Sequence, residues 1–330
     1  MSGEASAFWI AEPGRGEIRR ERLAAPAADG VLVEALWSGI SRGTEALVFA
    51  GRVPPSEWTR MRAPFQAGEF PAPVKYGYAS VGRVVQGPQA LTGRAVFVLH
   101  PHQTQYVVPS SAVHPLPDDV PPRRAVLAAN LETALNVVWD AEVQPGDRVA
   151  VIGGGTVGCL TAWLAGRMPG CEVQLVDVNP RRDAVARAMG VSPARPDDAT
   201  READVVVHAS GTPDGLQQAL ALAGDEARFV EASWFGDGLV PLPLGGAFHA
   251  RRLTIVSSQV GRVPPGRRSR WDTRRRMQVA LGELRHEALD ALITGESRFD
   301  ELPAVMARLA EAPGDTLCHC IRYPAAGPGA

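Results

Sequence analysis

The chain of 330 residues is 45% hydrophobic and 21% charged, which is typical of a globular protein long enough for two domains. Its 34 basic and 36 acidic residues nearly balance, and it has no charged tail, so the sequence argues against a nucleic-acid-binding protein. An uncharged run at residues 149–166 approaches the length of a membrane span. A glycine-rich turn interrupts this run, and we therefore expect no membrane-spanning segment.

Short hydrophobic runs between Gly, Pro and Asp residues predict a β-rich region over residues 1–118. The runs lie at residues 7–10, 30–36, 78–85, 94–99 and 104–109. A helical pattern over residues 123–139 follows, after which strands alternate with helices. The expected strands are 148–153, 172–178, 204–210, 227–233 and 253–258. Such alternation predicts an α/β fold with a doubly wound parallel sheet.

A basic segment over residues 262–276 follows this sheet, and beyond it we expect a helix over residues 272–285 and then further strands and a helix. The arginines of the segment are Arg262, Arg267, Arg268, Arg270, Arg274, Arg275 and Arg276. Two interpretations stay open. The segment is either a solvent-exposed linker and helix start, or a clamp in which arginines such as Arg270 bind an acidic group of a substrate.

The most informative motif is the glycine pattern Gly153-x-Gly155-x-x-Gly158, which follows a predicted strand and opens an apolar helix through Thr156 and Val157. In a dinucleotide-binding unit, the first glycine permits a tight turn, the second lets the backbone approach the pyrophosphate, and the third lets helix and strand pack closely. Free N–H groups at the helix N-terminus then face the phosphates. Asp177 ends the next strand, where a carboxylate can bind an adenosine ribose. The sequence therefore predicts a Rossmann domain that binds a nicotinamide cofactor.

The identity of the cofactor depends on the residues around this acid. Asp177 would repel the 2′-phosphate of NADP, so the sequence favours NAD. Arg181 and Arg182 could bind that phosphate instead, and NADP stays possible. Cofactors also lie outside the carboxyl ends of parallel strands. The residues expected to contact the cofactor there are Ser210, Ala232, Ser233 and Ser258, and Trp234 is expected to line the substrate pocket.

The four cysteines, Cys159, Cys171, Cys318 and Cys320, are too few and too unevenly spaced for a disulfide framework. Cys318 and Cys320 flank His319 in a short predicted strand, in which alternate residues face opposite sides. We expect free thiols there and no metal. Free thiols, together with a first segment that lacks a signal-peptide pattern, predict a cytoplasmic protein.

The order of these parts resembles the medium-chain dehydrogenase/reductase superfamily over nearly the whole chain. The segments SGISRGTEALVFAGRVP, FPAPVKYGYASVGRVV and VIGGGTVG are most similar to the subgroup that includes bacteriochlorophyllide dehydrogenase. The resemblance implies a GroES-like catalytic domain at residues 1–122 and 268–330, and a Rossmann domain at residues 123–267. It also implies a small-molecule substrate and a homodimer, with residues 253–261 as the edge strand.

Zinc-dependent members of the superfamily hold a catalytic zinc with a Cys, a His and a third Cys or Glu. The matching positions here are Ser41, Tyr78 and one near Ala129, none of which is a good zinc ligand. Residues 95–115 also lack the cysteines of a structural zinc. The resemblance therefore implies a zinc-independent enzyme. It further implies that Arg42 contacts the cofactor pyrophosphate and that Thr133 packs beside the nicotinamide.

Without zinc, hydrogen-bond donors and a general base must hold the substrate oxygen. The resemblance places six catalytic candidates around the metal position: Ser41, Glu45, Tyr78, His100, His102 and Glu132. A histidine that titrates near neutrality would suit proton exchange with an alcohol, which makes His100 and His102 candidates. Tyr78 could donate to the substrate oxygen or simply pack as a half-buried ring. Glu45 and Glu132 could orient a donor or cap local structure.

The favoured function is a zinc-independent dehydrogenase that moves hydride between a nicotinamide cofactor and a secondary alcohol or ketone. A second function is NADPH-dependent reduction of polarised C=C bonds or quinones, as in other zinc-free members of the superfamily. A third is a cofactor-binding protein without catalysis, because the zinc ligands are missing.

Overall fold

The computed structural model describes residues 3–324, and the chain divides into two compact units. The first comprises Met1–Ala129 with Leu281–Ala330, and the second Asn130–Ala280. The expected boundaries, 122/123 and 267/268, lie earlier in the chain than these. The reason is that helices α3 (Ala128–Ala141) and α7 (Thr273–Glu283) each run across an observed boundary.

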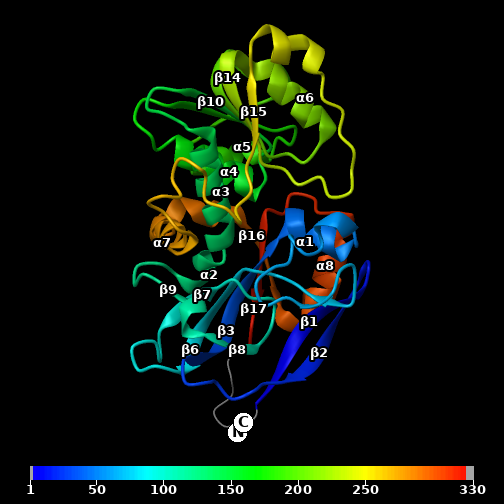
Figure 1. Cartoon of the computed structure of the whole chain (residues 1–330), viewed down its shortest axis with the longest axis vertical. Coiled ribbons are helices and arrows are strands. Elements are labelled where there is room, and N and C mark those ends of the chain that lie inside the picture. The colour runs from blue at the N-terminus through cyan, green and yellow to red at the C-terminus, as the bar shows by residue number, and fades with distance from the viewer. Residues whose placement is uncertain (1–2, 325–330) are drawn as a thin grey trace. The chain divides into compact units, whose positions relative to one another are not determined.

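The first unit contains a mixed seven-stranded sheet with the order β16-β17-β3-β6-β7-β9, in which β8 also pairs with β3 (Figure 1). Its strands are β3 (Gly30–Ser41), β6 (Ser80–Gln86), β7 (Ala95–Val98), β8 (Gln105–Pro109), β9 (His114–Pro115), β16 (Ile293–Arg298) and β17 (Cys318–Arg322). The long strand β3 lies in the middle of the sheet, and helix α1 (Arg42–Phe49) begins directly after it. This junction fixes the positions of Ser41, Arg42 and Glu45.

A second sheet of the same unit has the order β2-β1-β5-β4. Its strands are β1 (Glu4–Glu12), β2 (Arg15–Arg22), β4 (Ala67–Gly68) and β5 (Val74–Lys75). Strand β2 has the sequence RGEIRRER and pairs antiparallel with β1 along its whole length. The sequence did not predict β2, because it lacks the hydrophobic alternation of a strand. Helix α8 (Leu302–Glu311) packs against both β2 and α1.

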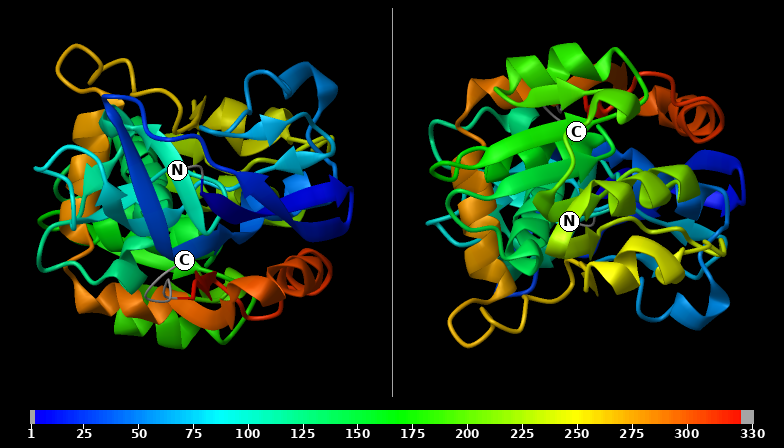
Figure 2. Two further views of the ribbon diagram at one scale, coloured as in Figure 1. Left: turned by 90° about the horizontal axis from the view of Figure 1, so that it is seen from below. Right: turned by 90° about the horizontal axis from the view of Figure 1, so that it is seen from above.

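The second unit is built on a six-stranded parallel sheet with the order β12-β11-β10-β13-β14-β15. Its strands are β10 (Arg148–Ile152), β11 (Glu172–Val176), β12 (Ser192–Ala194), β13 (Ala203–His208), β14 (Ala223–Glu231) and β15 (Thr254–Ser257). Helices α4 (Thr156–Ala165), α5 (Arg182–Ala188) and α6 (Pro213–Leu222) connect them, and Figure 2 shows helices on both sides of the sheet. The predicted doubly wound parallel sheet is therefore confirmed, and β15 lies at its edge as expected.

The strand order reverses between β11 and β13, which both flank β10. This is the switch point at which ligands bind in doubly wound sheets, outside the carboxyl ends of the strands. The core behind it consists of buried aliphatic and aromatic side chains, among them Ile152, Val206 and Phe229. The rigid sheet thus presents the residues that follow β10, β11, β13 and β14 along one edge.

Shorter elements complete the two units. They are α2 (Pro122–Ala125), 3-10 turns at Pro55–Glu57, Ser110–Ala112, Pro196–Asp198, Glu287–Leu292 and Phe299–Glu301, and a π-helical turn at Leu244–Phe248. Within residues 3–324, no helix is both long and apolar enough to cross a membrane.

Candidate functional site

Three glycines form the turn between β10 and α4, and each is required for a different reason. Gly153 has a φ of +107°, a backbone conformation that favours glycine. A Cβ atom at Gly158 would lie 1.8 Å from the carbonyl oxygen of Gly153, so only glycine lets α4 approach the strand this closely. A Cβ at Gly155 would meet no atom within 4 Å, so open space lies outside the turn there. Thr156 and Val157 begin α4 beside this space. The turn therefore fits a pyrophosphate.

Asp177 lies directly after β11, at the mouth of the same turn. Its Oδ2 accepts a hydrogen bond of 2.6 Å from the Gly154 N–H, and its Oδ1 accepts one of 2.7 Å from the Asn179 N–H. The buried stem of Arg182 packs against Gly154, because a Cβ there would lie 3.1 Å from the Arg182 Cγ. The predicted residues Asp177 and Arg182 thus come together at the glycine turn.

Sequence reasoning missed Arg195, which follows β12. Its guanidinium donates a hydrogen bond of 2.6 Å to the Asp177 carbonyl oxygen and forms an ion pair with Asp183. The only signal for it was an arginine directly after a strand of the same sheet. Arg195 fixes the backbone that carries Asp177.

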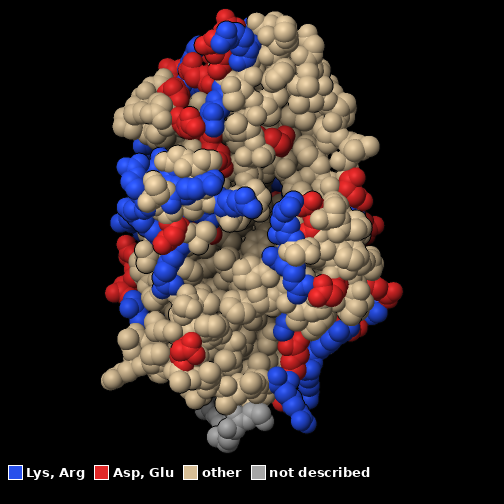
Figure 3. Space-filling model, in the orientation of Figure 1, with Lys and Arg blue, Asp and Glu red and all other residues tan. Residues whose placement is uncertain are grey.

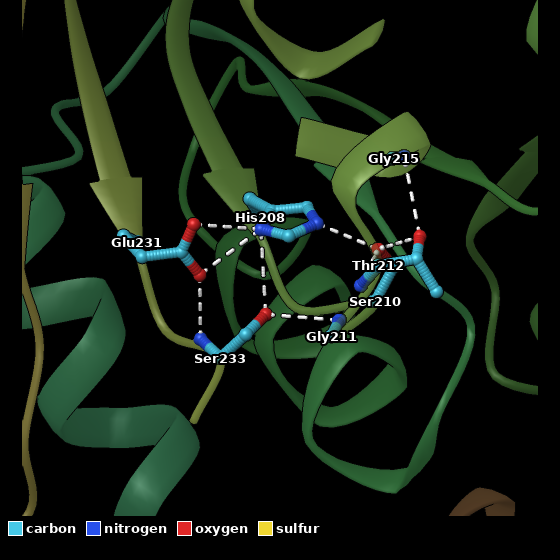
Figure 4. A network of polar contacts seen from close by, with 7 residues as sticks. All are labelled: His208, Ser210, Gly211, Thr212, Gly215, Glu231 and Ser233. Carbon is cyan, nitrogen blue, oxygen red and sulfur yellow. Dashed lines mark hydrogen bonds and ion pairs between the residues drawn. The ribbon is translucent and has the colours of Figure 1, made fainter. Parts of the chain in front are cut away.

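The residues that follow β13 and β14 form a continuous polar network (Figure 4). His208 ends β13 and is fully buried, and its Nδ1 lies 2.8 Å from Oε2 of Glu231, which ends β14. The Nε2 of His208 lies 2.6 Å from the Ser210 Oγ. The Gly211 N–H donates a hydrogen bond of 3.0 Å to the Ser233 Oγ, which links the two loops. The predicted residues Ser210 and Ser233 therefore lie together.

The sequence did not predict His208 and Glu231, because each ends a hydrophobic run that reads as core. A signal exists in the two segments VVVHAS and RFVEAS, which place a polar residue before the same Ala-Ser pair. In the parallel register of β13 and β14, His208 and Glu231 are direct neighbours. Ala232 lies between Glu231 and Ser233, and its N–H donates to the His208 carbonyl oxygen at 2.9 Å. Trp234 follows and is half-buried.

Ser258, after β15, is held by helix α3. Its hydroxyl donates a hydrogen bond of 2.7 Å to Oδ2 of Asp140 and accepts one of 3.3 Å from the Asn136 amide. Burial raises the pKa of Asp140 above its usual range, while the hydrogen bond from Ser258 opposes this. The Ser258 side chain thus ties β15 to α3, which is a structural role in addition to the predicted contact with a cofactor.

Helix α3 also carries Glu132 and Thr133. Glu132 is buried and forms an ion pair with Arg276 of α7, with 3.0 Å between Oε1 and Nε. Arg276 is 1% exposed and also donates to the Asn136 side chain and to the Val260 carbonyl oxygen. Burial raises the pKa of Glu132, and the Arg276 charge lowers it in part. The predicted catalytic residue Glu132 is therefore occupied by an ion pair within the second unit, and Thr133 lies half-buried beside it.

The arginine-rich segment does not act as a unit. Arg276 is buried, as described, whereas Arg262, Arg268, Arg270, Arg274 and Arg275 are exposed. Figure 3 shows Lys and Arg side chains gathered where Figure 1 shows α7. Arg270 lines a hollow of the second unit together with Trp139, Met168 and Arg267, and the Arg267 guanidinium lies 4.7 Å from the Trp139 ring centre. Met168 lies beyond the C-terminal end of α4, so this hollow is separate from the glycine turn, and the interpretation of Arg270 as a clamp for a substrate stays a prediction.

In the first unit, four of the predicted catalytic residues lie together. The Ser41 N–H donates a hydrogen bond of 2.7 Å to Oε1 of Glu45, and Oε2 of Glu45 lies 2.9 Å from Nε2 of His102. The Tyr78 hydroxyl shares hydrogen bonds with the side chains of Ser41 and Thr44. Burial and the nearby Glu45 charge raise the pKa of Tyr78 to about 12. Tyr78 therefore keeps its proton at neutral pH and can act as a hydrogen-bond donor.

His102 is enclosed by the first unit. It is 1% exposed, and its Nδ1 lies 2.7 Å from the Ser38 Oγ, which in turn lies 3.0 Å from the Tyr323 hydroxyl. Both ring nitrogens of His102 therefore have partners inside the protein. Its position suits the orientation of Glu45, and through Glu45 that of Ser41.

His100 is buried between two rings. The sequence led us to expect a histidine that titrates near neutrality, and this environment does not give one. It stacks on Tyr106, with 3.7 Å between ring centres and 10° between ring planes, and lies 5.5 Å from the Phe65 ring. Its Nδ1 lies 2.9 Å from the Pro101 carbonyl oxygen. Burial lowers the pKa of His100 to about 3. The prediction of proton exchange by His100 is therefore wrong, since the buried ring stays neutral.

The positions that the resemblance matches to zinc ligands offer an unsuitable set of donors. Ser41 and Tyr78 are neutral hydroxyl groups that bond to each other, and Ala129 is aliphatic. Zinc in proteins prefers thiolate, imidazole and carboxylate ligands. No group of three such side chains that could hold a metal occurs within residues 3–324, and Cys318 and Cys320 lie buried in β17 as free thiols. The residues present do not fit a catalytic zinc.

Known proteins whose sequences match part of this chain include named dehydrogenases. The 2-dehydro-3-deoxy-L-galactonate 5-dehydrogenase of Pseudoalteromonas atlantica is 29% identical over 139 residues, which cover 39% of this chain and 40% of the relative. An uncharacterized zinc-type alcohol dehydrogenase-like protein of Haemophilus influenzae is 26% identical over 223 residues, covering 63% and 61%. The matches thus span less than two thirds of these relatives. No family model matches the chain.

Solved structures resemble the whole chain. The L-idonate 5-dehydrogenase of Escherichia coli superimposes with a TM-score of 0.80 at 16% identity, covering 98% of this chain and 99% of that one. A protein of Sinorhizobium meliloti described as a zinc-binding dehydrogenase, solved with NADP bound, gives a TM-score of 0.77 at 18% identity, covering 97% and 99%. The chain therefore has the fold of alcohol dehydrogenases, with GroES-like and Rossmann domains.

Partial sequence matches to named dehydrogenases and the shared fold agree with the broader resemblance to medium-chain, zinc-type alcohol dehydrogenases. Similarity to the bacteriochlorophyllide dehydrogenase subgroup stays a prediction.

Proposed function

We propose that this protein is an NAD(P)-dependent oxidoreductase that transfers hydride between a nicotinamide cofactor and a secondary alcohol or ketone. The observation that carries the proposal is the glycine turn, where Gly153, Gly155 and Gly158 leave open space at the N-terminus of α4 and Asp177 lies at the mouth. The names of the relatives and of the similar structures point to the same chemistry. When bound, the nicotinamide ring supplies the hydride acceptor or donor.

NAD is the proposed cofactor, because the Asp177 carboxylate at the turn disfavours a second negative charge on the adenosine ribose. NADP is the alternative. Arg182 lies beside Asp177, and a similar structure contains NADP. A comparison of the affinities for NADH and NADPH decides between them. An Asp177→Ala variant shifts the preference toward NADPH if Asp177 sets it.

Zinc independence is part of the proposal, even though related proteins are described as zinc-type. Tyr78, Ser41 and Thr44 form a cluster of hydroxyl groups, and the raised pKa of Tyr78, about 12, keeps its proton available for a hydrogen bond. In this proposal Tyr78 holds the substrate oxygen by donating to it, while Glu45 and His102 fix the cluster from behind. Donors that are already oriented stabilise a developing negative charge without rearrangement.

The test uses the full-length protein with NAD and NADP against a panel of secondary alcohols, including polyols and hydroxy acids. We expect NAD reduction that survives treatment with a chelator, and metal analysis that gives far less than one zinc per chain. A loss of activity on chelation that added zinc restores would overturn zinc independence. Turnover of enones but not of alcohols would indicate the C=C or quinone reductase, and cofactor binding without any turnover a non-catalytic protein.

We further propose that the enzyme is a cytoplasmic homodimer. The free cysteines suit a reducing compartment, and β15 leaves one edge of the parallel sheet open for pairing with a second copy. Light scattering after gel filtration should give twice the mass of 35.1 kDa. A Val256→Pro variant on β15 should lower the observed mass toward that of the monomer, because proline cannot take part in strand pairing.

A further inference from the structure

A polar network joins the ends of β13 and β14 (Figure 4). The donor and the acceptor of each of its hydrogen bonds can be assigned, starting from Glu231. The Glu231 carboxylate can only accept hydrogen bonds. It accepts a hydrogen bond of 2.7 Å from the Ser233 N–H, and its other oxygen lies 2.8 Å from Nδ1 of His208. Because the carboxylate has no proton to donate, Nδ1 must carry the proton of this second bond. In the neutral imidazole Nε2 is then bare and must accept. Within residues 3–324, the donor that contacts Nε2 is the Ser210 hydroxyl at 2.6 Å, which therefore directs its proton toward His208.

The same reasoning extends to Thr212. The Ser210 Oγ has used its proton, so the contact of 2.9 Å between the two hydroxyl groups requires Thr212 to be the donor. The Thr212 Oγ1 also accepts from the Gly215 N–H at 3.2 Å, as the N-cap of α6. One lone pair of the exposed Thr212 Oγ1 is left for another partner. The series of hydrogen bonds that starts at Glu231 and runs through His208 and Ser210 thus ends at the surface with Thr212, whose Oγ1 can accept a further hydrogen bond.

Ser233 has the opposite polarity. Its Oγ accepts from the Gly211 N–H at 3.0 Å and lies 3.3 Å from Nδ1 of His208, which carries a proton directed at Glu231 and so cannot accept one from Ser233. Among the bonds of residues 3–324, none uses the Ser233 hydroxyl proton, so this half-buried group is left as a donor. The Ser233 Oγ bonds to the backbone of Gly211, and Thr212 is the next residue, so the donor is tied to the residue that precedes the acceptor.

The network is continuous with the phosphate turn. A Cβ at Gly153 would lie 2.5 Å from the Ser210 backbone nitrogen, so the backbones of the two loops touch. A dinucleotide whose pyrophosphate lies at the glycine turn, with its adenosine toward Asp177 on β11, would extend in the other direction along the edge, toward β13 and β14.

We propose that Thr212 and Ser233 bind the nicotinamide half of the dinucleotide as a paired acceptor and donor, whose polarity Glu231 sets through His208 and Ser210. Such a pair is complementary to a group that carries a donor beside an acceptor. Both the carboxamide of nicotinamide and the cis-diol of its ribose have this chemistry. The inference rests on the proposed function, since it requires a dinucleotide at the glycine turn. His208 and Glu231 are positioning residues in this scheme.

Calorimetry on the full-length protein with three ligands tests this proposal. AMP occupies only the adenosine end, ADP-ribose adds the second ribose, and NADH adds the nicotinamide. We expect Thr212→Val and Ser233→Ala each to weaken NADH binding about fivefold, the effect of one neutral hydrogen bond, and to leave AMP binding unchanged. If ADP-ribose is weakened equally, the ribose diol is the partner. If ADP-ribose is unaffected, the carboxamide is.

A polarity variant separates binding from structure. In Glu231→Gln the side-chain oxygen still accepts from the Ser233 N–H, and the amide then donates to Nδ1 of His208. This reverses every hydroxyl up to Thr212, so NADH binding should weaken about as much as in Thr212→Val although Thr212 is intact. Ser233→Thr keeps the donor and should bind NADH like the wild type. Asp214→Asn, on the exposed first turn of α6, is the control.

Two results would overturn the proposal, and they differ. If Thr212→Val, Ser233→Ala and Glu231→Gln only lower the unfolding temperature and keep wild-type affinity for NADH, the network is purely structural. If the wild type binds none of AMP, ADP-ribose and NADH, the proposed function itself fails, and this inference with it.

Discussion

Two glycines of the turn should respond differently to replacement with alanine. Gly155→Ala should mainly weaken cofactor binding, and Gly158→Ala should mainly lower the stability of the fold. Gly155 has φ −74° and ψ 177°, which alanine adopts without strain, and an added Cβ meets no atom within 4 Å. We expect Gly155→Ala to lower the free energy of unfolding by no more than about 1 kcal/mol, through the loss of a good N-cap residue. The same Cβ fills the space left for the pyrophosphate. NADH affinity should therefore fall at least tenfold, or about 1.4 kcal/mol.

Gly158→Ala should behave differently, because its Cβ would lie 1.8 Å from the Gly153 carbonyl oxygen. That contact forces α4 away from β10, and overpacking of this kind costs about 1–3 kcal/mol. With an unfolding entropy of about 2.1 cal/mol/K per residue, the unfolding temperature of this chain of 330 residues should fall by about 1.5 °C for each kcal/mol. Scanning calorimetry of the apo proteins and titration with NADH measure both effects. A Gly155→Ala variant that binds NADH like the wild type would refute the assignment of the phosphate site.

Three further variants test other parts of the structure. Tyr78→Phe should lower kcat about tenfold or more and leave NADH affinity unchanged, as measured by steady-state kinetics, because only the hydrogen bond to the substrate oxygen is lost. Burial lowers the pKa of His100 from 6.5 to about 3, so between these pH values the unfolded chain binds a proton that the folded chain does not. The free energy of unfolding should therefore fall as the pH drops from about 6.5 toward 3. His100→Phe should make this fall smaller, as measured by denaturant titrations at several pH values. Arg276→Met leaves the buried Glu132 unpaired and should cost about 3–5 kcal/mol of unfolding free energy. Arg276→Met with Glu132→Gln should cost less; equal losses would show that the unpaired Glu132 carboxylate carries no penalty and that the loss comes from the bonds of Arg276 to Asn136 and Val260.

The geometry of the glycine turn, the candidate cofactor site, could be predicted because its signals are local in the sequence. A strand, a turn with three glycines and a helix occupy adjacent residues, and the roles of Gly153 and Gly158 follow from backbone geometry alone. Asp177 belongs to the next strand of the same βαβ unit. The sequence also predicted the parallel sheet, since buried strands such as β13 read as continuous runs of valine.

The polar half was predicted less well, because its chemistry depends on partners far apart in the sequence. His100 and His102 are separated by one residue, yet one stacks on Tyr106 and Phe65 while the other bonds to Glu45 and Ser38. Their environments could not be read from the segment HPH. Strand β2 was missed for a similar reason, since its charged residues form a strand only because β1 pairs with them.

His208 and Glu231 combine a local signal with a distant partner, because each is a polar residue in a hydrophobic strand and the two strands pair. Each looks like an irregularity in a hydrophobic strand, and neither predicts a partner by itself. A parallel sheet changes that, because adjacent strands in register bring residues at matching positions side by side. Once β13 and β14 are taken as neighbours, the shared Ala-Ser ending of VVVHAS and RFVEAS aligns His208 with Glu231 and Ser210 with Ser233. A polar pair at the carboxyl ends of adjacent parallel strands therefore indicates a candidate ligand site. Both residues of the pair can be seen in the sequence, but their pairing can be recognised only when the order of the strands is known.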